Sequence, residues 1–144
     1  MSPSTLRILF ALFLIAHGAM TMSLATVPVP APGALRTPYL PAWWRADTDS
    51  AWPASKLGLS PTLVRTVGWL LWLAALVLFA VAGLGLLGLP GLNTFWQPLA
   101  AAGAVVSLVL LALYWHPWLA LGVLINIGVL AGGLSGWFTR WFAN

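Results

Sequence analysis

The sequence contains no cysteine and no glutamate, and its only acidic residues are Asp47 and Asp49. Without cysteine the chain has no disulfides, no thiolate metal site and no cysteine nucleophile. So few carboxylates argue against di-iron chemistry, general acid–base hydrolysis and proton-coupled transport, which usually rest on carboxyl groups. Only 6% of the residues are charged and 61% are hydrophobic, whereas a soluble domain carries about 25% charged residues. The composition therefore predicts a protein of the cell membrane.

The six basic residues are scattered along the chain. Because they form no run, we expect no nucleic-acid partner, which would need a phosphate-binding stripe. They instead flank the apolar runs and bear on membrane orientation. The long loop after the first run has more Lys and Arg than the side that carries the termini, which favours a loop inside the cell. Arg7 before the first run resembles the start of an export signal, which favours an N-terminus inside the cell. We predict that the termini lie inside and keep the opposite orientation as the alternative.

Four apolar stretches meet or approach the length of a membrane-spanning helix, which is roughly 20 residues for a hydrocarbon core about 30 Å thick. They cover about residues 6–25, 62–88, 95–115 and 117–138. The ten-residue alternation of barrel strands is absent. The sequence therefore predicts an all-α integral membrane protein, a single multi-pass bundle of four transmembrane helices.

Local signals mark two of the helix starts. Ser60 before Pro61 supplies a capping hydroxyl and a proline whose missing N–H is harmless in a first turn, so the second helix should begin there. The third helix should be capped by Asn93 or Thr94, after the break at Pro90.

Residues 26–60 form a long connection with a composition of its own. It holds more than half of the prolines, both aspartates and the tryptophans Trp43, Trp44 and Trp52. Tryptophan rings combine an apolar body with a polar N–H and favour the headgroup region, so we expect an interfacial loop. A short helix or a packed cap is expected within it, with disorder as the alternative. The aspartates are expected to be solvated rather than to bind a cation.

The first apolar run also resembles a secretory signal peptide. Arg7, the apolar residues after it and Ser23-Leu24-Ala25 match the three zones of such a signal. Because the run is long enough for a permanent helix, we predict that it is retained. Cleavage after Ala25, which would leave three spans, is the alternative.

Polar residues inside the spans are the candidates for function, because they are costly in lipid. His17 in the first span and Asn126 in the fourth are candidate cofactor-binding residues for a haem, a quinone or a pigment. We favour a packing role for both, in which His17 hydrogen-bonds another helix, for example through Asn126, and Asn126 fixes the helix register; cofactor binding is the alternative. His116 lies at a helix end and is not expected to share a haem with His17. No catalytic or metal-binding residue is predicted.

Four residues outside the long loop are expected at the membrane–water boundary. Arg65 lies one turn inside the second helix and can extend toward headgroups along its aliphatic stem, with anion or substrate binding as the alternative. The short connection before the fourth span contains or borders Trp115, His116 and Trp118. This cluster predicts an interfacial aromatic belt.

Small residues predict close packing of the last two helices. Gly128, Gly132 and Gly136 recur at four-residue intervals, the spacing that lets transmembrane helices approach closely. The third span offers a comparable surface, made of Ala100, Gly103, Ala104 and Ser107. We expect these surfaces to pack within the monomer, with oligomerisation as the alternative. Gly83, Gly85 and Gly88 cluster at the end of the second span and are expected only to mark fraying or a bend.

One short motif and the overall layout point to a family. The first span contains a His-Gly pair in Leu14-Ile15-Ala16-His17-Gly18, and a Pro/Trp-rich connection and three closely spaced spans follow. This layout resembles the DoxX-like group of small bacterial four-helix membrane proteins. The resemblance implies a location in the bacterial inner membrane and, for some members, association with quinone-linked oxidoreductases. The chain lacks the intramembrane acidic residues that would accompany such a role.

Three functional hypotheses follow from these observations. The first is a non-enzymatic accessory subunit, surrounded by lipid, that packs against larger membrane proteins or a second copy of itself. The second is a quinone- or haem-associated redox component, based on His17 and Asn126. The third is a small-molecule transporter, although no charged pore and no inverted repeat are visible.

Overall fold

The computed structural model describes residues 2–23, 56–115 and 119–143, and the regular secondary structure in these ranges is helical. The helices are α1 (Pro3–Ser23), α3 (Pro61–Leu86), α4 (Trp96–Leu113), α5 (Ala120–Leu134) and α6 (Trp137–Ala143). Several predicted features lie outside the described residues: most of the loop over 26–60, the cleavage site after Ala25, and Trp43, Trp44, Trp52, His116 and Trp118.

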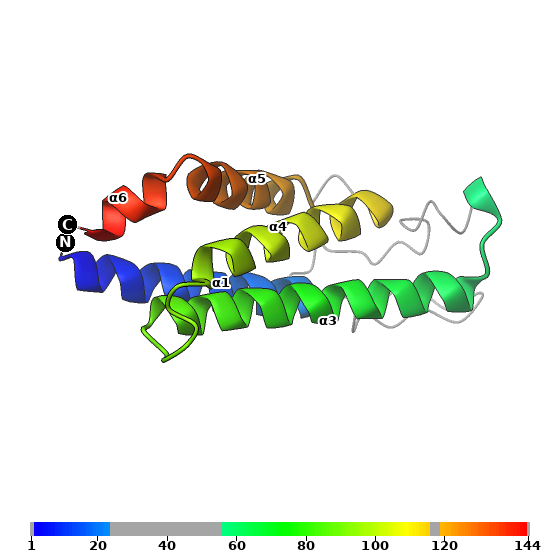
Figure 1. The fold of residues 1–144 in the computed structure, drawn as a ribbon. Helices are drawn as coiled ribbons and strands as arrows, with labels where there is room; N and C mark the ends of the chain where they lie inside the picture. Colours follow the sequence, from blue (N-terminus) through cyan, green and yellow to red (C-terminus); the bar gives the residue numbers. More distant parts are fainter. Residues whose placement is uncertain (1, 24–55, 116–118, 144) are drawn as a thin grey trace.

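Successive helices run in alternate directions along an elongated bundle (Figure 1). α1 starts at the end that carries both termini, α3 returns to that end, α4 leaves it, and α5 followed by α6 leads back (Figure 1). Neighbouring pairs in contact are α1 with α3, α3 with α4, α4 with α5, and α6 with both α1 and α5. The last helix therefore closes the bundle against the first.

Three helices are long and apolar enough to cross a membrane, over Pro3–Thr21, Thr62–Leu86 and Trp96–Leu113. The fourth long helix, α5, is also apolar but has only 15 residues. At 1.5 Å per residue it is about 22 Å long, which is shorter than a hydrocarbon core of about 30 Å.

The predicted start of the second helix is confirmed. Ser60 is the N-cap of α3, and its side-chain oxygen accepts a hydrogen bond from the backbone N–H of Leu63 at 3.2 Å. Pro61 occupies the first turn. The hydroxyl thereby satisfies one of the N–H groups that have no partner inside the helix.

The predicted cap of the third helix is wrong, because neither Asn93 nor Thr94 is the N-cap of α4. That position is occupied by Phe95, and no side chain makes a capping hydrogen bond. A series of backbone turns leads into the helix instead, with the N–H of Phe95 donating to the carbonyl of Leu92 at 3.0 Å.

The fourth predicted span, over 117–138, differs most from the structure, since α5 ends at Leu134 and the last two residues of the span begin a separate helix, α6. Ser135 and Gly136 separate them. Gly136 has a φ of 65°, a left-handed conformation that glycine adopts without steric penalty. Gly136 consequently lies in a turn and not on the face of a helix.

Local hydrogen bonds make this break compatible with an apolar environment. The N–H of Ser135 donates to the carbonyl of Ala131 at 3.0 Å, and that of Gly136 to Gly133 at 3.3 Å. The guanidinium of Arg140 donates to the carbonyl of Ser135 at 3.5 Å. Backbone groups without a partner would be costly in lipid, so this pairing limits the cost of the turn.

Buried side chains from four helices form the central core. They are Leu14 of α1, Phe79 and Ala82 of α3, Ala100 and Ala104 of α4, and Val129 of α5. At the end of the bundle away from the termini, the hydroxyl of Tyr114 donates to the backbone carbonyl of Val64, which ties the end of α4 to α3.

Glycines bring α1 and α3 together. A Cβ on Gly83 would lie 2.7 Å from Cγ1 of Ile15 and 2.8 Å from the carbonyl oxygen of Ala11. A Cβ on Gly18 would lie 3.0 Å from Cβ of Phe79. The two helices approach to a distance that larger residues would prevent. Gly83 is therefore a packing residue, and the expectation that it only marks fraying or a bend was wrong.

Candidate functional site

Four polar side chains are buried among the described residues, and three of them meet in one cluster. The buried set is His17 and Thr21 on α1, Ser107 on α4 and Asn126 on α5. Ser107 and Asn126 have no exposed surface, and His17 is 8% exposed. We call His17, Ser107 and Asn126 the polar cluster.

Asn126 is the centre of the polar cluster. Its Oδ1 lies 3.2 Å from Nε2 of His17, and its Nδ2 donates to Oγ of Ser107 at 2.9 Å. The same Nδ2 donates to the carbonyl of Gly122, one turn earlier in α5, at 2.8 Å. One amide therefore links α1, α4 and α5. The structure thus joins the two candidate cofactor residues directly to each other.

The hydrogen bonds determine the orientation of the amide and the tautomer of the histidine. The carbonyl of Gly122 can only accept, so the NH₂ group of Asn126 must face it, and Oδ1 then faces His17. Because Oδ1 can also only accept, the proton of neutral His17 is on Nε2. The pair is a neutral donor and acceptor and needs no charged partner.

Aromatic rings surround His17. Phe13, one turn earlier in α1, stacks on the imidazole with ring centroids 5.9 Å apart, and Phe79 of α3 meets it edge-on at 5.1 Å. His17 therefore contacts side chains of α1, α3 and α5, and α4 is joined to it through Ser107 and Asn126. An apolar wall around a hydrogen-bonded pair strengthens that bond, because the local dielectric constant is low.

Thr21 does not join the polar cluster through its side chain. Its hydroxyl donates to the backbone carbonyl of His17 at 2.8 Å, which is a bond within one turn of α1. Thr21 thereby satisfies its own buried hydroxyl within α1.

The small-residue surface predicted for the third span is buried in α4. It consists of Ala100, Gly103, Ala104 and Ser107. A Cβ on Gly103 would lie 3.3 Å from side-chain atoms of Leu78 and Phe79, so this part of the surface packs against α3. Ser107 contacts α5 through Asn126.

The three glycines predicted to form one stripe have three different surroundings. A Cβ on Gly132 would overlap the ring of Phe138. The absence of a side chain at Gly132 therefore lets Phe138 of α6 pack against α5. Gly128 is exposed, and a Cβ there would meet nothing within 4 Å. Gly136 lies in the turn between α5 and α6. The four-residue spacing of these glycines does not indicate that their surroundings differ.

The predicted interfacial residues are described only in part. Trp115 lies two residues beyond the end of α4 and is 47% exposed. Arg65 lies in the second turn of α3, and its side chain is not among those described.

The polar cluster has donors and acceptors but no ionised group. Among the described residues, no three His, Cys, Asp or Glu side chains lie close enough to hold a metal ion together. No family model, curated protein or solved structure matches the chain. The similarity to the DoxX-like group therefore stays a prediction from the sequence. What the geometry of the cluster can do is hold three helices at fixed relative positions.

Two contributions to this site were not foreseen from the sequence. Phe79 packs against both His17 and the position of Gly18, but an apolar residue within an apolar run gives no signal of its own. Gly18 is visible as half of the His-Gly pair, and its role in admitting α3 depends on which helix lies opposite.

Proposed function

We propose that this protein is a non-enzymatic accessory subunit of the membrane, a small bundle that packs against another membrane protein through the outer face of α5. The observation that carries the proposal is the open position of Gly128 on an exposed apolar face. The polar cluster supports this non-enzymatic role, because it gives His17 a packing function within the membrane that requires neither catalysis nor a cofactor.

The hydrogen bonds and rings around His17 favour a packing role over a cofactor role. A haem iron or a quinone carbonyl at Nε2 would have to displace Asn126, which holds that nitrogen at 3.2 Å. Phe13 and Phe79 occupy space beside the imidazole. These residues do not fit a haem or a quinone at Nε2 without rearrangement.

The outer face of α5 has features of a helix–helix contact surface. Leu121 and Leu124 are 67% and 65% exposed, and Gly128 and Ala131 continue the same face one and two turns further on. A small residue between large ones lets the backbone of a second helix approach closely. Helices too short for the bilayer also favour association with other helices, and α5 is about 22 Å long.

The test compares Gly128→Leu with Gly133→Leu in protein purified from its own membranes in mild detergent. Gly133 is a matched control on the same helix, because a Cβ there also meets nothing within 4 Å, and five residues place it on a different face. We expect the wild type and Gly133→Leu to retain the same second membrane chain at a fixed ratio by native mass spectrometry. Gly128→Leu should lose it.

Two outcomes would contradict the proposal. One is a wild-type protein recovered from native membranes only as the isolated 15.3 kDa chain. The other is equal retention of the second chain by both variants. A third result is a homo-oligomer that contains no second chain and that Gly128→Leu disrupts. It would show that α5 is the contact face and that the protein associates with itself instead of serving as an accessory subunit.

A further inference from the structure

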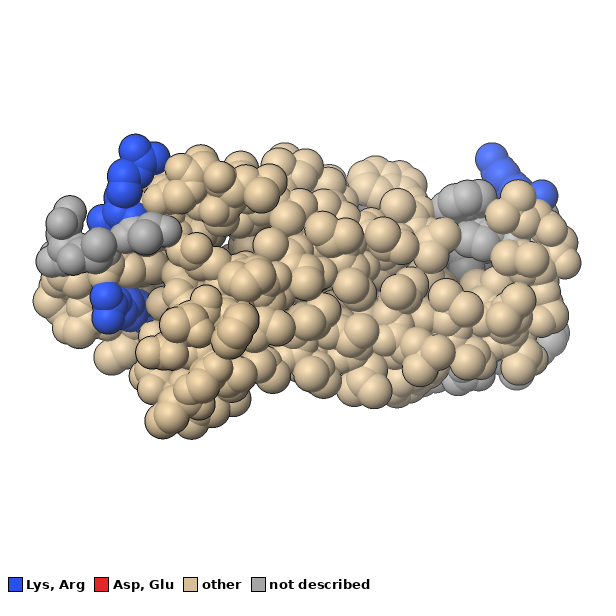
Figure 2. Space-filling view, in the orientation of Figure 1, with Lys and Arg blue, Asp and Glu red and all other residues tan. Residues whose placement is uncertain are grey.

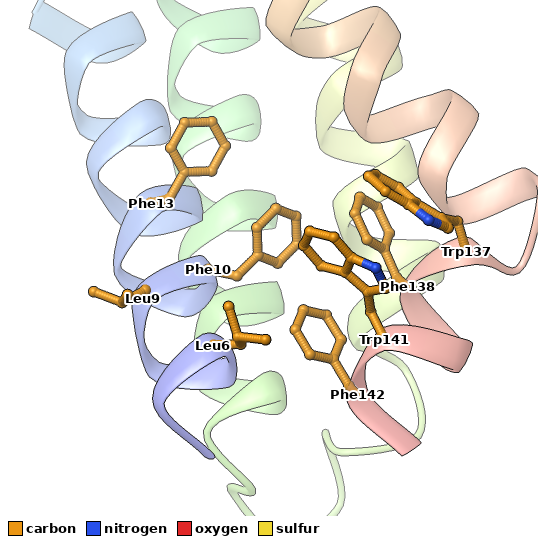
Figure 3. A pocket seen from close by; sticks show the side chains of 8 residues that line it. All are labelled: Leu6, Leu9, Phe10, Phe13, Trp137, Phe138, Trp141 and Phe142. Atoms are coloured by element: carbon orange, nitrogen blue, oxygen red, sulfur yellow. The ribbon is translucent and has the colours of Figure 1, made fainter. Parts of the chain in front are cut away.

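A groove lined by aromatic rings lies between the first half of α1 and the short helix α6. It has a volume of about 280 Å³, and its lining contains Phe10, Phe13, Trp137, Phe138, Trp141 and Phe142 (Figure 3). In Figure 3, Leu6 and Phe10 of α1 point toward the rings of α6. The groove exists because the turn at Gly136 brings α6 back onto α1.

The groove has a closed floor and exposed walls. Phe138 and Phe142 are buried, and the Phe10 ring lies 4.7 Å from Phe138, centroid to centroid, which closes the floor. Trp137 and Trp141 are 46% and 49% exposed, and they pack on each other at 4.6 Å to form one wall. Among the described residues nothing covers these walls, so an apolar chain can lie along them.

Each of the two helices that line the groove carries an arginine. Arg7 is exposed on α1, and its guanidinium donates to the backbone carbonyl of Phe142, which fixes it next to α6. Arg140 is exposed on α6, and its guanidinium donates to the carbonyl of Ser135, just before the start of that helix. The only acidic residues of the chain are Asp47 and Asp49, which lie outside both helices of the groove. No acidic side chain of these two helices therefore neutralises Arg7 or Arg140. On the face seen in Figure 2, the basic groups of the described residues lie at the two ends of the bundle, and the described surface between them carries no charge.

We propose that this groove binds one anionic phospholipid, with an acyl chain against the aromatic walls and the phosphate between Arg7 and Arg140. Guanidinium groups bind phosphate oxygens through paired, charge-assisted hydrogen bonds. Arg7 and Phe13 are six residues apart in α1, about 9 Å along the helix axis, so the groove leads from the charged end into the apolar part of the bundle. Tryptophan in the walls suits the headgroup boundary. This site is independent of the partner contact proposed for α5.

The experiment is a lipid competition on the purified full-length protein, read by native mass spectrometry. The protein is offered phosphatidylglycerol and phosphatidylcholine with identical acyl chains at equal concentration. The wild type should retain one phosphatidylglycerol in preference to phosphatidylcholine. The preference should fall about fivefold for each of Arg7→Gln and Arg140→Gln, because one basic group near a membrane surface contributes about that factor toward an anionic lipid. Glycerol phosphate, which has no acyl chain, should not be retained.

Lys56→Gln is the matched control, because it removes the same charge from an exposed residue in the segment before α3, at the end of the bundle away from the termini (Figure 1). It should bind like the wild type, and Arg7→Lys should restore most of the preference lost in Arg7→Gln. The double variant Trp137→Ala, Trp141→Ala should lose retention of both lipids. Equal retention of the two lipids by the wild type would overturn the proposal. So would an effect of Lys56→Gln as large as that of Arg140→Gln, or unchanged lipid retention without the tryptophans.

Discussion

Replacing Asn126 with leucine removes the amide at the centre of the polar cluster and keeps a side chain of similar size. The substitution deletes the bonds to His17 and Ser107 and leaves the N–H of His17 buried without its acceptor. An interhelical hydrogen bond in a membrane is worth about 0.6 kcal/mol on average and about 1.7 kcal/mol at most. With two such bonds lost, the free energy of unfolding should fall by about 1–3 kcal/mol.

Reversible unfolding of the purified protein by SDS in mixed micelles, followed by circular dichroism, measures this change. Ile127→Leu is the control on the same helix, since Ile127 is 50% exposed and belongs to no cluster of buried residues. It should leave the unfolding midpoint unchanged.

A double-mutant cycle with His17→Leu isolates the bond between His17 and Asn126. The two single variants should destabilise by more in sum than the double variant, because removing both partners leaves no buried group unpaired. We expect a coupling free energy of about 0.6–1.7 kcal/mol. A coupling of zero, or an Asn126→Leu protein as stable as Ile127→Leu, would show that the polar cluster does not hold these helices together.

Three further substitutions are measured by the same unfolding assay. Gly83→Ala should destabilise by about 1–3 kcal/mol, because its Cβ would press on α1; Gly128→Ala, with open space around it, should not, and equal effects would contradict the packing. Ser60→Ala should cost about 0.5–2 kcal/mol through loss of the α3 cap, and Ser60→Thr should retain stability; a Ser60→Ala protein as stable as the wild type would contradict the cap. Gly136→Ala should cost about 1–2 kcal/mol at its positive φ, and a neutral result would argue against the turn.

Features that depend on a few neighbouring residues could be predicted from the sequence. The start of α3 is one of these, because Ser60 and Pro61 act on the helix that follows them. The long apolar helices are another, because hydropathy reports the solvent directly. His17 and Asn126 could be named because polar groups are rare within such runs, and the structure places them in one hydrogen bond.

Features that depend on the opposite helix could not be predicted in the same way. Gly83 is one of several glycines near the end of α3, and only the position of Ile15 makes it a close-packing residue. The break at Gly136 is hidden because apolar residues continue on both sides of it. The groove beside α6 depends on that break, so its rings could be read from the sequence only as apolar residues.

We propose that His17 holds the bundle together and binds no cofactor. The most direct measurement is the visible absorption spectrum of protein purified from its own membranes, with quinone analysis of its organic extract. We expect a colourless protein with no stoichiometric quinone, and His17→Leu should change the unfolding midpoint but neither spectrum nor extract. A haem Soret band, a pigment band or a bound quinone that disappears in His17→Leu would contradict the claim.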